Sequence, residues 1–135
     1  AANLDSAFFV AKAYTAQLQP LKRAGSLLFF SSVAAGIGVA NHAAIAIAKG
    51  GIEALTRSLA ADFAGIGLRV NAIAPGWVAD PDDVTAADHE QHPVGRVGRA
   101  KDVAQAVLYL AAAEFVTGQV LTLDGGMTRK MIYAD

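Results

Sequence analysis

The sequence predicts an α/β fold, in which a parallel sheet carries helices on its faces. Short uninterrupted apolar runs alternate along the chain with longer segments in which apolar residues recur at helical spacing. The apolar content of 54% exceeds the roughly 45–50% typical of soluble domains, as strands buried on both faces require. A chain of 135 residues fits one domain, so we expect a single domain over residues 1–135, with right-handed connections between its strands.

The first two elements are predicted to be a helix over residues 2–23 and a strand over residues 27–30. The helix is indicated by a set of residues at helical spacing, namely Leu4, Phe8, Ala11, Thr15 and Leu18. Gly25 separates this helix from a continuous apolar run, Leu27-Leu28-Phe29-Phe30, which is typical of a parallel strand covered on both sides. The Gly-rich segment 31–42 is expected to be a loop.

A second helix is predicted over residues 43–63, with glycines as its stop. One face is apolar and carries Ile52, Leu55, Leu59 and Phe63. The opposite face consists mostly of small side chains, namely Ile47, Gly51, Ala54, Ser58 and Ala61. This second face suits either a helix of another subunit or close packing on the chain's own sheet, and we favour the subunit contact because two such faces need two partners. We therefore expect a homo-oligomer assembled through helices 2–23 and 43–63.

A strand over residues 68–74, a third helix and a strand over residues 120–124 complete the predicted order. The third helix is marked by Val103, Val107, Leu110 and Ala111. Loops that follow parallel strands lie at the same end of a sheet, so segments 31–42, 75–99 and 124 onward should form one crevice. Any chemistry is expected in that crevice. The acidic cluster Asp80-Pro81-Asp82-Asp83 is expected to be a solvated turn.

Charge and cysteine content exclude several classes of function. The 11 basic and 12 acidic residues are dispersed, so neither nucleic acid nor a membrane surface is an expected partner. The absence of cysteine excludes disulfides, thiolate metal sites and a cysteine nucleophile, and no metal site is expected. Residues 25–48 contain no Asp, Glu, Lys or Arg, but Gly36, Gly38 and Asn41 interrupt them, which favours a buried strand, loop and helix over a membrane span. Because no secretory signal opens the sequence, a cytoplasmic location is expected.

Several motifs follow one another in a fixed order along nearly the whole chain. They are Asn3-Leu4 with Phe8, Ser31-Ser32-Val33-Ala34-Ala35-Gly36, Ala48-Lys49-Gly50-Gly51-Ile52, Arg69 to Gly76, and Gly118 to Gly126. In this order they resemble the C-terminal half of a classical short-chain dehydrogenase/reductase. The resemblance implies a Rossmann-like, doubly wound fold of which residues 1–135 hold only the C-terminal half, about three strands. The family's Gly-rich dinucleotide-binding half would precede this region and is absent.

The same resemblance assigns candidate catalytic residues. Ser32 matches the serine that hydrogen-bonds the substrate oxygen, and Asn3 matches the asparagine that keeps a proton-relay water. Lys49 matches the lysine that holds the nicotinamide ribose. The family's proton-donating tyrosine is replaced by Ile45, which lies thirteen residues after Ser32 and four before Lys49.

Cofactor-binding positions follow from the resemblance as well. Pro75, Gly76 and Val78 match the turn beside the nicotinamide, and Lys49 matches the ribose contact. The family's chemistry implies NAD or NADP as cofactor and a small alcohol or carbonyl compound as substrate. Asp80 stands where a threonine is common, and its carboxylate can only accept hydrogen bonds.

Ile45 decides between two functions. Isoleucine has no titratable or hydrogen-bonding group, so it cannot act as a general acid or base. His42 is an alternative proton donor nearby, although a histidine in that place is expected to be a cap or to face solvent. We favour an NAD(P)-dependent oxidoreductase that is impaired in this chain by Ile45 and by the missing cofactor loop. The alternative is a catalytically silent relic that acts only as an oligomerising or structural subunit.

Two further expectations concern the edges of the half-fold. The strand over residues 27–30 would have a neighbour from the missing half, so we expect it to expose an apolar edge that a second copy or a partner chain covers. The segment from Met127 to Tyr133 resembles the family's C-terminal extension and is expected to serve in packing and subunit contact.

Overall fold

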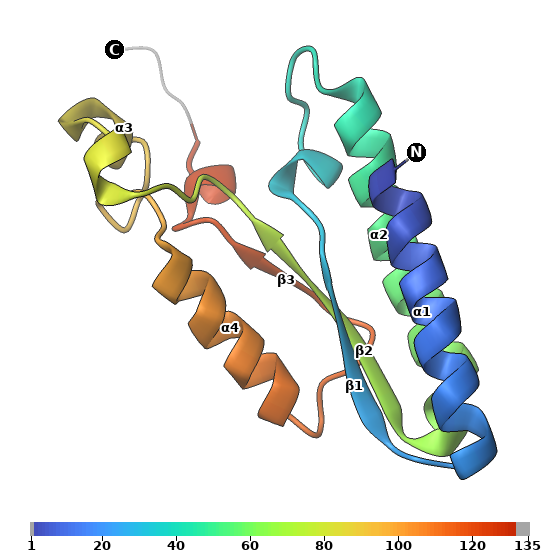
Figure 1. Ribbon diagram of the computed structural model, residues 1–135. Helices are drawn as coiled ribbons and strands as arrows, with labels where there is room; N and C mark the ends of the chain where they lie inside the picture. Colours follow the sequence, from blue (N-terminus) through green and yellow to red (C-terminus); the bar gives the residue numbers. More distant parts are fainter. Residues whose placement is uncertain (1, 132–135) are drawn as a thin grey trace.

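The computed structural model describes residues 2–131, which form a parallel sheet between two layers of helices (Figure 1). The helices are α1 (Ala2–Leu21), α2 (Ala43–Asp62), α3 (Ala86–Glu90) and α4 (Ala100–Ala112). The strands are β1 (Gly25–Phe30), β2 (Leu68–Pro75) and β3 (Val120–Leu123). The predicted α/β class and the order of its elements are therefore confirmed, with α3 as an addition that the sequence patterns did not predict.

β2 is the central strand of the sheet. The strand order is β1-β2-β3, and both pairings are parallel, with Gly25 opposite Leu68 and Ala72 opposite Val120. A strand with neighbours on both edges and helices on both faces is shielded from water. Accordingly, Val70, Ala72 and Ile73 are fully buried, and they form the centre of the core.

Alternate side chains of β2 point into two separate cores. Val70 and Ala72 belong to the core under α1 and α2, whereas Ile73 belongs to the core under α4. This is the alternation that a strand buried on both faces produces. In Figure 1, α1 and α2 cover one face of the sheet and α4 covers the other.

The two connections between strands have opposite hands. Both step in the same direction across the sheet, from β1 to β2 and from β2 to β3, yet α2 and α4 lie on opposite faces. A given step is right-handed with its helix on one face and left-handed with its helix on the other. The expectation of right-handed connections throughout is therefore wrong for one of the two.

Element boundaries differ from the predicted ones by one or two residues. The first helix ends at Leu21 rather than at residue 23, and the second ends at Asp62 rather than at residue 63. Gly67 adopts a φ of 73° just before β2, a left-handed conformation that glycine tolerates and most residues do not. Of the predicted C-terminal extension, residues 132–133 lie outside the described part of the chain.

The small-residue face of α2 meets a helix of its own chain at one point. Gly51 lies under Leu4 of α1, where an added Cβ would be 2.8 Å from a Leu4 methyl carbon. The remaining members of that face are exposed, Ile47 with 74% of its surface. Close approach at Gly51 therefore serves the α1–α2 contact, which is neither of the two contacts weighed from the sequence.

β1 forms one edge of the sheet. Within residues 2–131 it pairs with β2 alone, so the backbone groups along its other edge have no strand partner. Phe29 is buried, but Phe30 at the end of the strand is 45% exposed. The predicted unpaired apolar edge is therefore confirmed, and the expectation that the whole strand is covered on both sides is wrong at Phe30.

Candidate active site

The carboxyl end of β1 is fastened to α2 through Ser31 and Lys49. The buried Ser31 hydroxyl donates a 2.8 Å hydrogen bond to the Glu53 carboxylate and lies 3.3 Å from the Lys49 carbonyl oxygen. The Lys49 ammonium donates a 2.9 Å hydrogen bond to the Phe30 carbonyl oxygen. Lys49 and Glu53 are four residues apart and share one face of α2, so a single helical turn holds the end of the strand.

Ser32 caps the first turn of the loop that follows β1. Its Oγ accepts a 3.2 Å hydrogen bond from the backbone N–H of Ala34, as the N-cap of the 3₁₀ turn Val33–Ala35. Accepting this bond leaves the hydroxyl proton available to a ligand. Ser32 therefore retains the donor that the resemblance requires at this position.

Asn3 and Lys49 line one groove. Asn3 lies in the first turn of α1, and the groove, of about 300 Å³, runs along the outer edge of β1. Ser32 lines a different cavity. The fold thus brings two of the four predicted catalytic positions together in this groove, while Ser32 is joined to Lys49 only through the turn at the end of β1.

Ile45 lies in the first turn of α2, one turn before Lys49, and is 38% exposed. The nearby His42 offers its Nδ1 to the carbonyl oxygen of Ala40 at 2.6 Å, and because a carbonyl only accepts, that nitrogen carries the proton. His42 is exposed and makes no side-chain bond to the start of α2. It faces solvent, in agreement with the expectation for that position.

Gly76 is held in a close backbone crossing after β2. Its N–H donates a 2.9 Å hydrogen bond to the Leu123 carbonyl oxygen, and an added Cβ would lie 2.7 Å from the Cβ of Asp124. Only glycine fits such an approach. Two residues further on, Val78 forms a bridge with Gly98, which closes the base of the long loop after β2. The predicted cofactor positions Pro75, Gly76 and Val78 are therefore also structural junctions.

Asp124 organises the turn that follows β3. Its carboxylate accepts hydrogen bonds from the N–H of Gly126 at 2.9 Å and from the N–H and hydroxyl of Thr128 at 2.8 and 2.6 Å. Burial works to raise the pKa of Asp124, but these hydrogen bonds, with the charge of Arg129, outweigh it and lower the pKa below its ordinary value. The carboxylate therefore stays ionised and keeps the turn closed.

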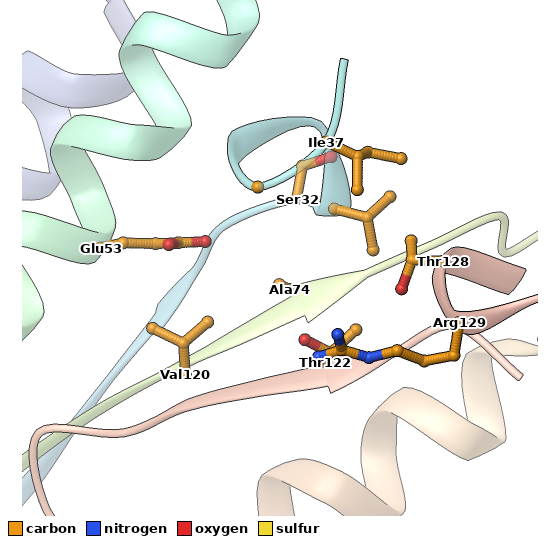
Figure 2. A pocket seen from close by; sticks show the side chains of 10 residues that line it. Ser32, Ile37, Glu53, Ala74, Val120, Thr122, Thr128 and Arg129 are labelled. Carbon is orange, nitrogen blue, oxygen red and sulfur yellow. The ribbon is translucent and has the colours of Figure 1, made fainter. Parts of the chain in front are cut away.

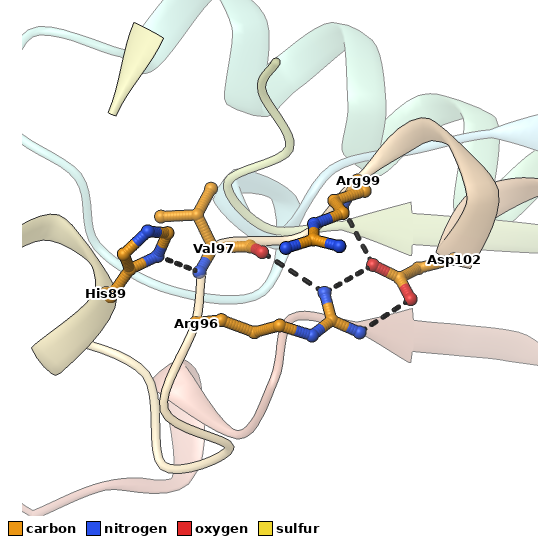
Figure 3. A network of polar contacts seen from close by, with 5 residues as sticks. All are labelled: His89, Arg96, Val97, Arg99 and Asp102. Carbon is orange, nitrogen blue, oxygen red and sulfur yellow. Dashed lines mark hydrogen bonds and ion pairs between the residues drawn. The ribbon is translucent and has the colours of Figure 1, made fainter. Parts of the chain in front are cut away.

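An ion pair anchors the loop after β2 to α4 (Figure 3). Arg96 donates two hydrogen bonds to Asp102, at 2.7 and 2.8 Å, and Asp102 also accepts from the Arg99 backbone N–H at 2.7 Å. The Arg96 hydrogen bond, followed by that of Arg99, lowers the pKa of Asp102 to about 2. On the other side of Arg96, the Val97 N–H donates to Nδ1 of His89 at 3.0 Å. The acidic cluster earlier in this loop forms an exposed 3₁₀ turn, Pro81–Asp83, as expected.

The loops at the carboxyl ends of the strands line two cavities, each of about 210 Å³. One lies between Ser32, Glu53 and Arg129 (Figure 2). The other lies beside the long loop, between Trp77 and Asp124. The sheet separates them, because Ala74 in the first cavity and Leu123 in the second belong to opposite faces. The single crevice expected from the sequence is therefore divided in two.

Comparisons with known proteins identify the family. A family model described as enoyl-(acyl carrier protein) reductase matches residues 1–128. The chain is 37% identical, over 95% of its length, to an "inactive 2-(S)-hydroxypropyl-CoM dehydrogenase 2" of Xanthobacter autotrophicus and covers 61% of that protein. The chain belongs to the short-chain dehydrogenase/reductase family.

Solved structures of this family agree with the fold. An apo SCOR enzyme from Clostridium thermocellum matches 97% of the chain with a TM-score of 0.87 and 36% identity, and the chain covers 52% of it. A gluconate 5-dehydrogenase from Burkholderia cenocepacia, in complex with NADP and tartrate, matches 96% with a TM-score of 0.85 and 31% identity, and the chain covers 54% of it. The chain thus spans little more than half the length of the family members it matches.

Some site residues of this family member were not predicted. Glu53 could have been noticed, because it lies one turn after Lys49 and is the first acidic residue of α2. Thr122, Thr128 and Arg129 gave no such signal, since only the folded sheet brings them to the cavity beside Ser32. Within residues 2–131, no group of three or more His, Cys, Asp or Glu side chains is placed to hold a metal ion. In the same range, no helix has the length and hydropathy needed to cross a bilayer.

Proposed function

We propose that the protein containing this chain is an NAD(P)-dependent oxidoreductase of alcohols or carbonyl compounds, in which the general acid and base step is impaired. The observation that carries the proposal is Ile45, which occupies the tyrosine position one turn before Lys49. Ser32 and Lys49 keep their donors and their fixed backbone contacts around it. Loss of a general acid lowers a rate by roughly 10²–10⁴, so hydride transfer would be slowed rather than abolished.

The residues present fit a nicotinamide cofactor. The Lys49 ammonium has three donor protons and uses one for Phe30, which leaves the others for ribose hydroxyls. Pro75, Gly76 and Val78 form a rigid turn at the carboxyl end of β2, where ligands bind in such sheets. The cofactor would supply or accept the hydride, while Ser32 would hold the substrate oxygen. Selectivity for NAD or NADP would lie in the dinucleotide-binding half found in relatives.

The experiment that tests cofactor use is binding of NAD(H) and NADP(H), followed by thermal unfolding of the protein. Stabilisation that grows with cofactor concentration supports an oxidoreductase, because a ligand bound to the native state alone raises its stability. Lys49→Met should reduce the stabilisation by the cofactor. Lys101 is an exposed lysine on α4, and Lys101→Met should leave that stabilisation unchanged. In the 135-residue chain alone, without a dinucleotide-binding half, we expect no turnover even after Ile45→Tyr.

The second candidate is a silent subunit that acts through assembly, with which Ile45 is also compatible. A protein that shows no shift at saturating cofactor yet remains an oligomer would support this candidate and contradict the first. The relative named inactive is 37% identical to this chain, which makes loss of activity a reasonable alternative within the family.

We further propose that the protein forms a homo-oligomer through α1 and α2 and acts in the cytoplasm. A groove between these helices, of about 400 Å³, is lined by Asp5 and otherwise by apolar residues or glycine, among them Phe8 and Phe9. Their rings meet edge to face at 5.7 Å, and both side chains are exposed. Exposed aromatic side chains that gather beside an apolar groove favour a protein contact. Fractionation of the source cells would test the location.

A further inference from the structure

Apolar and polar side chains together line the cavity beside Ser32 (Figure 2). Ala74 of β2 and Val120 of β3 line it from the sheet, and Val33, Gly36 and Ile37 line it from the loop after β1. Its volume of about 210 Å³ is below the roughly 300–1,000 Å³ of pockets for drug-sized ligands. The cavity therefore suits a small metabolite.

Two opposite charges stand on opposite sides of this cavity. Glu53 reaches in from α2, and Arg129 reaches in from the turn after β3 (Figure 2). They do not neutralise each other, because the one ion pair within residues 2–131 joins Arg96 to Asp102. A ligand between Glu53 and Arg129 could therefore pair with both charges.

Each charged group has hydrogen-bonding capacity left for a ligand. One oxygen of Glu53 accepts from the Ser31 hydroxyl at 2.8 Å, and no donor in the described part of the chain reaches the other oxygen. Over the same residues, the Arg129 guanidinium makes no hydrogen bond, and the nearby Asp124 is already occupied by Gly126 and Thr128. A carboxylate suits a guanidinium because two parallel N–H groups can be accepted at once, and an ammonium suits the open carboxylate oxygen.

We propose that this cavity binds a small ω-amino acid, with its ammonium on Glu53, its carboxylate on Arg129 and its methylene groups on Ala74 and Val120. Because Glu53 and Arg129 enter the cavity from different elements, the proposed ligand carries its two charges at the ends of a short chain. The hydroxyls of Ser32 and Thr122 lie at the same cavity and supply further polar contacts. The inference goes beyond the proposed oxidoreductase chemistry and does not rest on it, since binding requires no cofactor.

Isothermal titration of the cofactor-free protein tests the proposal with β-alanine, γ-aminobutyrate and ε-aminocaproate. Butyrate and butylamine are matched probes, because each keeps the chain of γ-aminobutyrate and one of its charges. At least one of the three amino acids should bind about tenfold or more tightly than either single-charge probe, since each charged contact is worth about a factor of ten. No binding of any amino acid at about 10 mM, or equal binding of butyrate, would overturn the proposal.

Variants separate the two contacts from a general effect of charge. Arg129→Gln and Glu53→Gln should each weaken binding of the amino acid by about tenfold. The glutamine at position 53 still accepts the Ser31 hydrogen bond. Lys130→Gln removes the same charge as Arg129→Gln from an exposed side chain outside the cavity and should change nothing. Equal weakening by Lys130→Gln would overturn the assignment.

Glu53→Gln provides a readout that partial unfolding cannot imitate. With the carboxylate removed, butyrate should bind at least as well as it does to the parent protein, because its repulsion by Glu53 is gone. If Glu53→Gln weakened the binding of the amino acid and of butyrate to the same extent, an ammonium site at Glu53 would be contradicted. Failure of NAD(P)-linked turnover would leave all these titrations unaffected, so the two proposals fail independently.

Discussion

Around Ile45, hydrogen bonds fix the neighbouring residues without using the side chain at position 45. The turn of α2 that follows Ile45 holds the end of β1 through Lys49 and Glu53. Ser32 is fixed by its own cap bond to Ala34. None of these contacts uses the side chain at position 45, so replacement of a tyrosine there leaves them in place. The fold and the chemistry are therefore separable at the scale of single residues.

Gly76 offers a residue-scale test of the crossing between β2 and the turn after β3. In Gly76→Ala the new Cβ would meet the Cβ and Cα of Asp124 at 2.7 and 3.0 Å, and backbone there cannot move cheaply. We expect a loss of about 1–3 kcal/mol in the free energy of unfolding, measured by urea denaturation. Gly38→Ala is the matched control, because nothing lies within 4 Å of the added Cβ. Equal midpoints of urea denaturation for the two variants would contradict the predicted crowding at Gly76.

Asp102 gives the protein a pH-dependent contribution to stability. Hydrogen bonds from Arg96 and then Arg99 lower the pKa of Asp102 from 3.8 to about 2. A folded-state pKa below the unfolded value stabilises the protein above the unfolded pKa, and this contribution is lost as the pH falls from about 4 toward 2. Asp102→Asn should therefore destabilise the protein at neutral pH. It should also make the melting temperature depend less steeply on pH between about 4 and 2, as measured by thermal unfolding.

The matched control for the pH profile is Asp62→Asn, which changes an exposed aspartate at the end of α2. This variant should leave the acid limb of the profile as steep as in the parent protein. If Asp102→Asn also leaves the limb unchanged, the Arg96 pair does not govern the stability of this loop.

Single elements of the fold depend on polar contacts that fix where they end. The carboxyl end of α4 is capped by Arg69 of β2, whose guanidinium donates to the carbonyl oxygens of Leu110, Ala111 and Ala113 at 2.7 to 2.9 Å. The last carbonyls of a helix have no partner within it, and a cation there also opposes the negative end of the helix dipole. One side chain thus joins the central strand to the helix on its second face.

Arg69→Met should destabilise the protein by about 1–3 kcal/mol, because the charged hydrogen bonds to the carbonyl groups at the end of α4 are lost. Urea denaturation measures the loss, and amide hydrogen exchange should show faster exchange in the last turn of α4. Arg57→Met removes the same group from an exposed position on α2 and should change the midpoint little. If amide exchange in the last turn of α4 were equally fast in Arg69→Met and Arg57→Met, the capping role of Arg69 would be contradicted.

Periodicity predicted most elements because their apolar faces are local properties of the sequence. The continuous run at Leu27–Phe30 marks a strand that the structure extends to Gly25, and the spacing of Val103, Val107 and Leu110 marks a helix that the structure bounds at Ala100 and Ala112. α3 was missed because it has five residues, too few for a period, although Thr85 and Asp88 form a capping box at its start. The pairing of Ser31 with Glu53 joins two elements, and no local pattern encodes it.

Candidate site residues could be proposed from the sequence where a motif kept its spacing, as for Asn3, Ser32, Ile45 and Lys49, and their roles stay predictions. What the resemblance could not give was their distribution over a groove and a cavity, which depends on how α2 lies across the sheet. The opposite hands of the two connections could not be read from the sequence either. The apolar spacing of α4 fits either face of the sheet, and only packing decides between them.

At the scale of the whole molecule, the described chain leaves two apolar surfaces without a partner. One is the outer edge of β1, and the other is the groove between α1 and α2. An open strand edge without a covering partner invites pairing with another chain. For the 135-residue chain by itself, we expect a second copy to cover the edge, and a monodisperse monomer at micromolar concentration in sedimentation would contradict this.

Phe9→Glu tests the oligomer proposed through α1 and α2. Phe9 is 63% exposed beside the groove, so a glutamate there leaves the monomer's core intact but places an unpaired charge in an apolar contact. We expect the sedimentation coefficient to fall toward that of the monomer, with an unchanged circular dichroism spectrum. Phe115→Glu, at an exposed position after α4, is the control and should leave assembly through α1 and α2 intact.

Steady-state turnover of the complete protein decides whether Ile45 stands in place of a proton donor, as proposed. NAD(P)-linked oxidation and reduction of a panel of alcohols and ketones should be compared for the parent, Ile45→Tyr and the control Ile47→Tyr. We predict that the turnover rate rises by a factor of roughly 10²–10⁴ in Ile45→Tyr and does not rise in Ile47→Tyr, because only position 45 lies one turn before Lys49. Equal rates in the parent and Ile45→Tyr, whether high or zero, would contradict the claim.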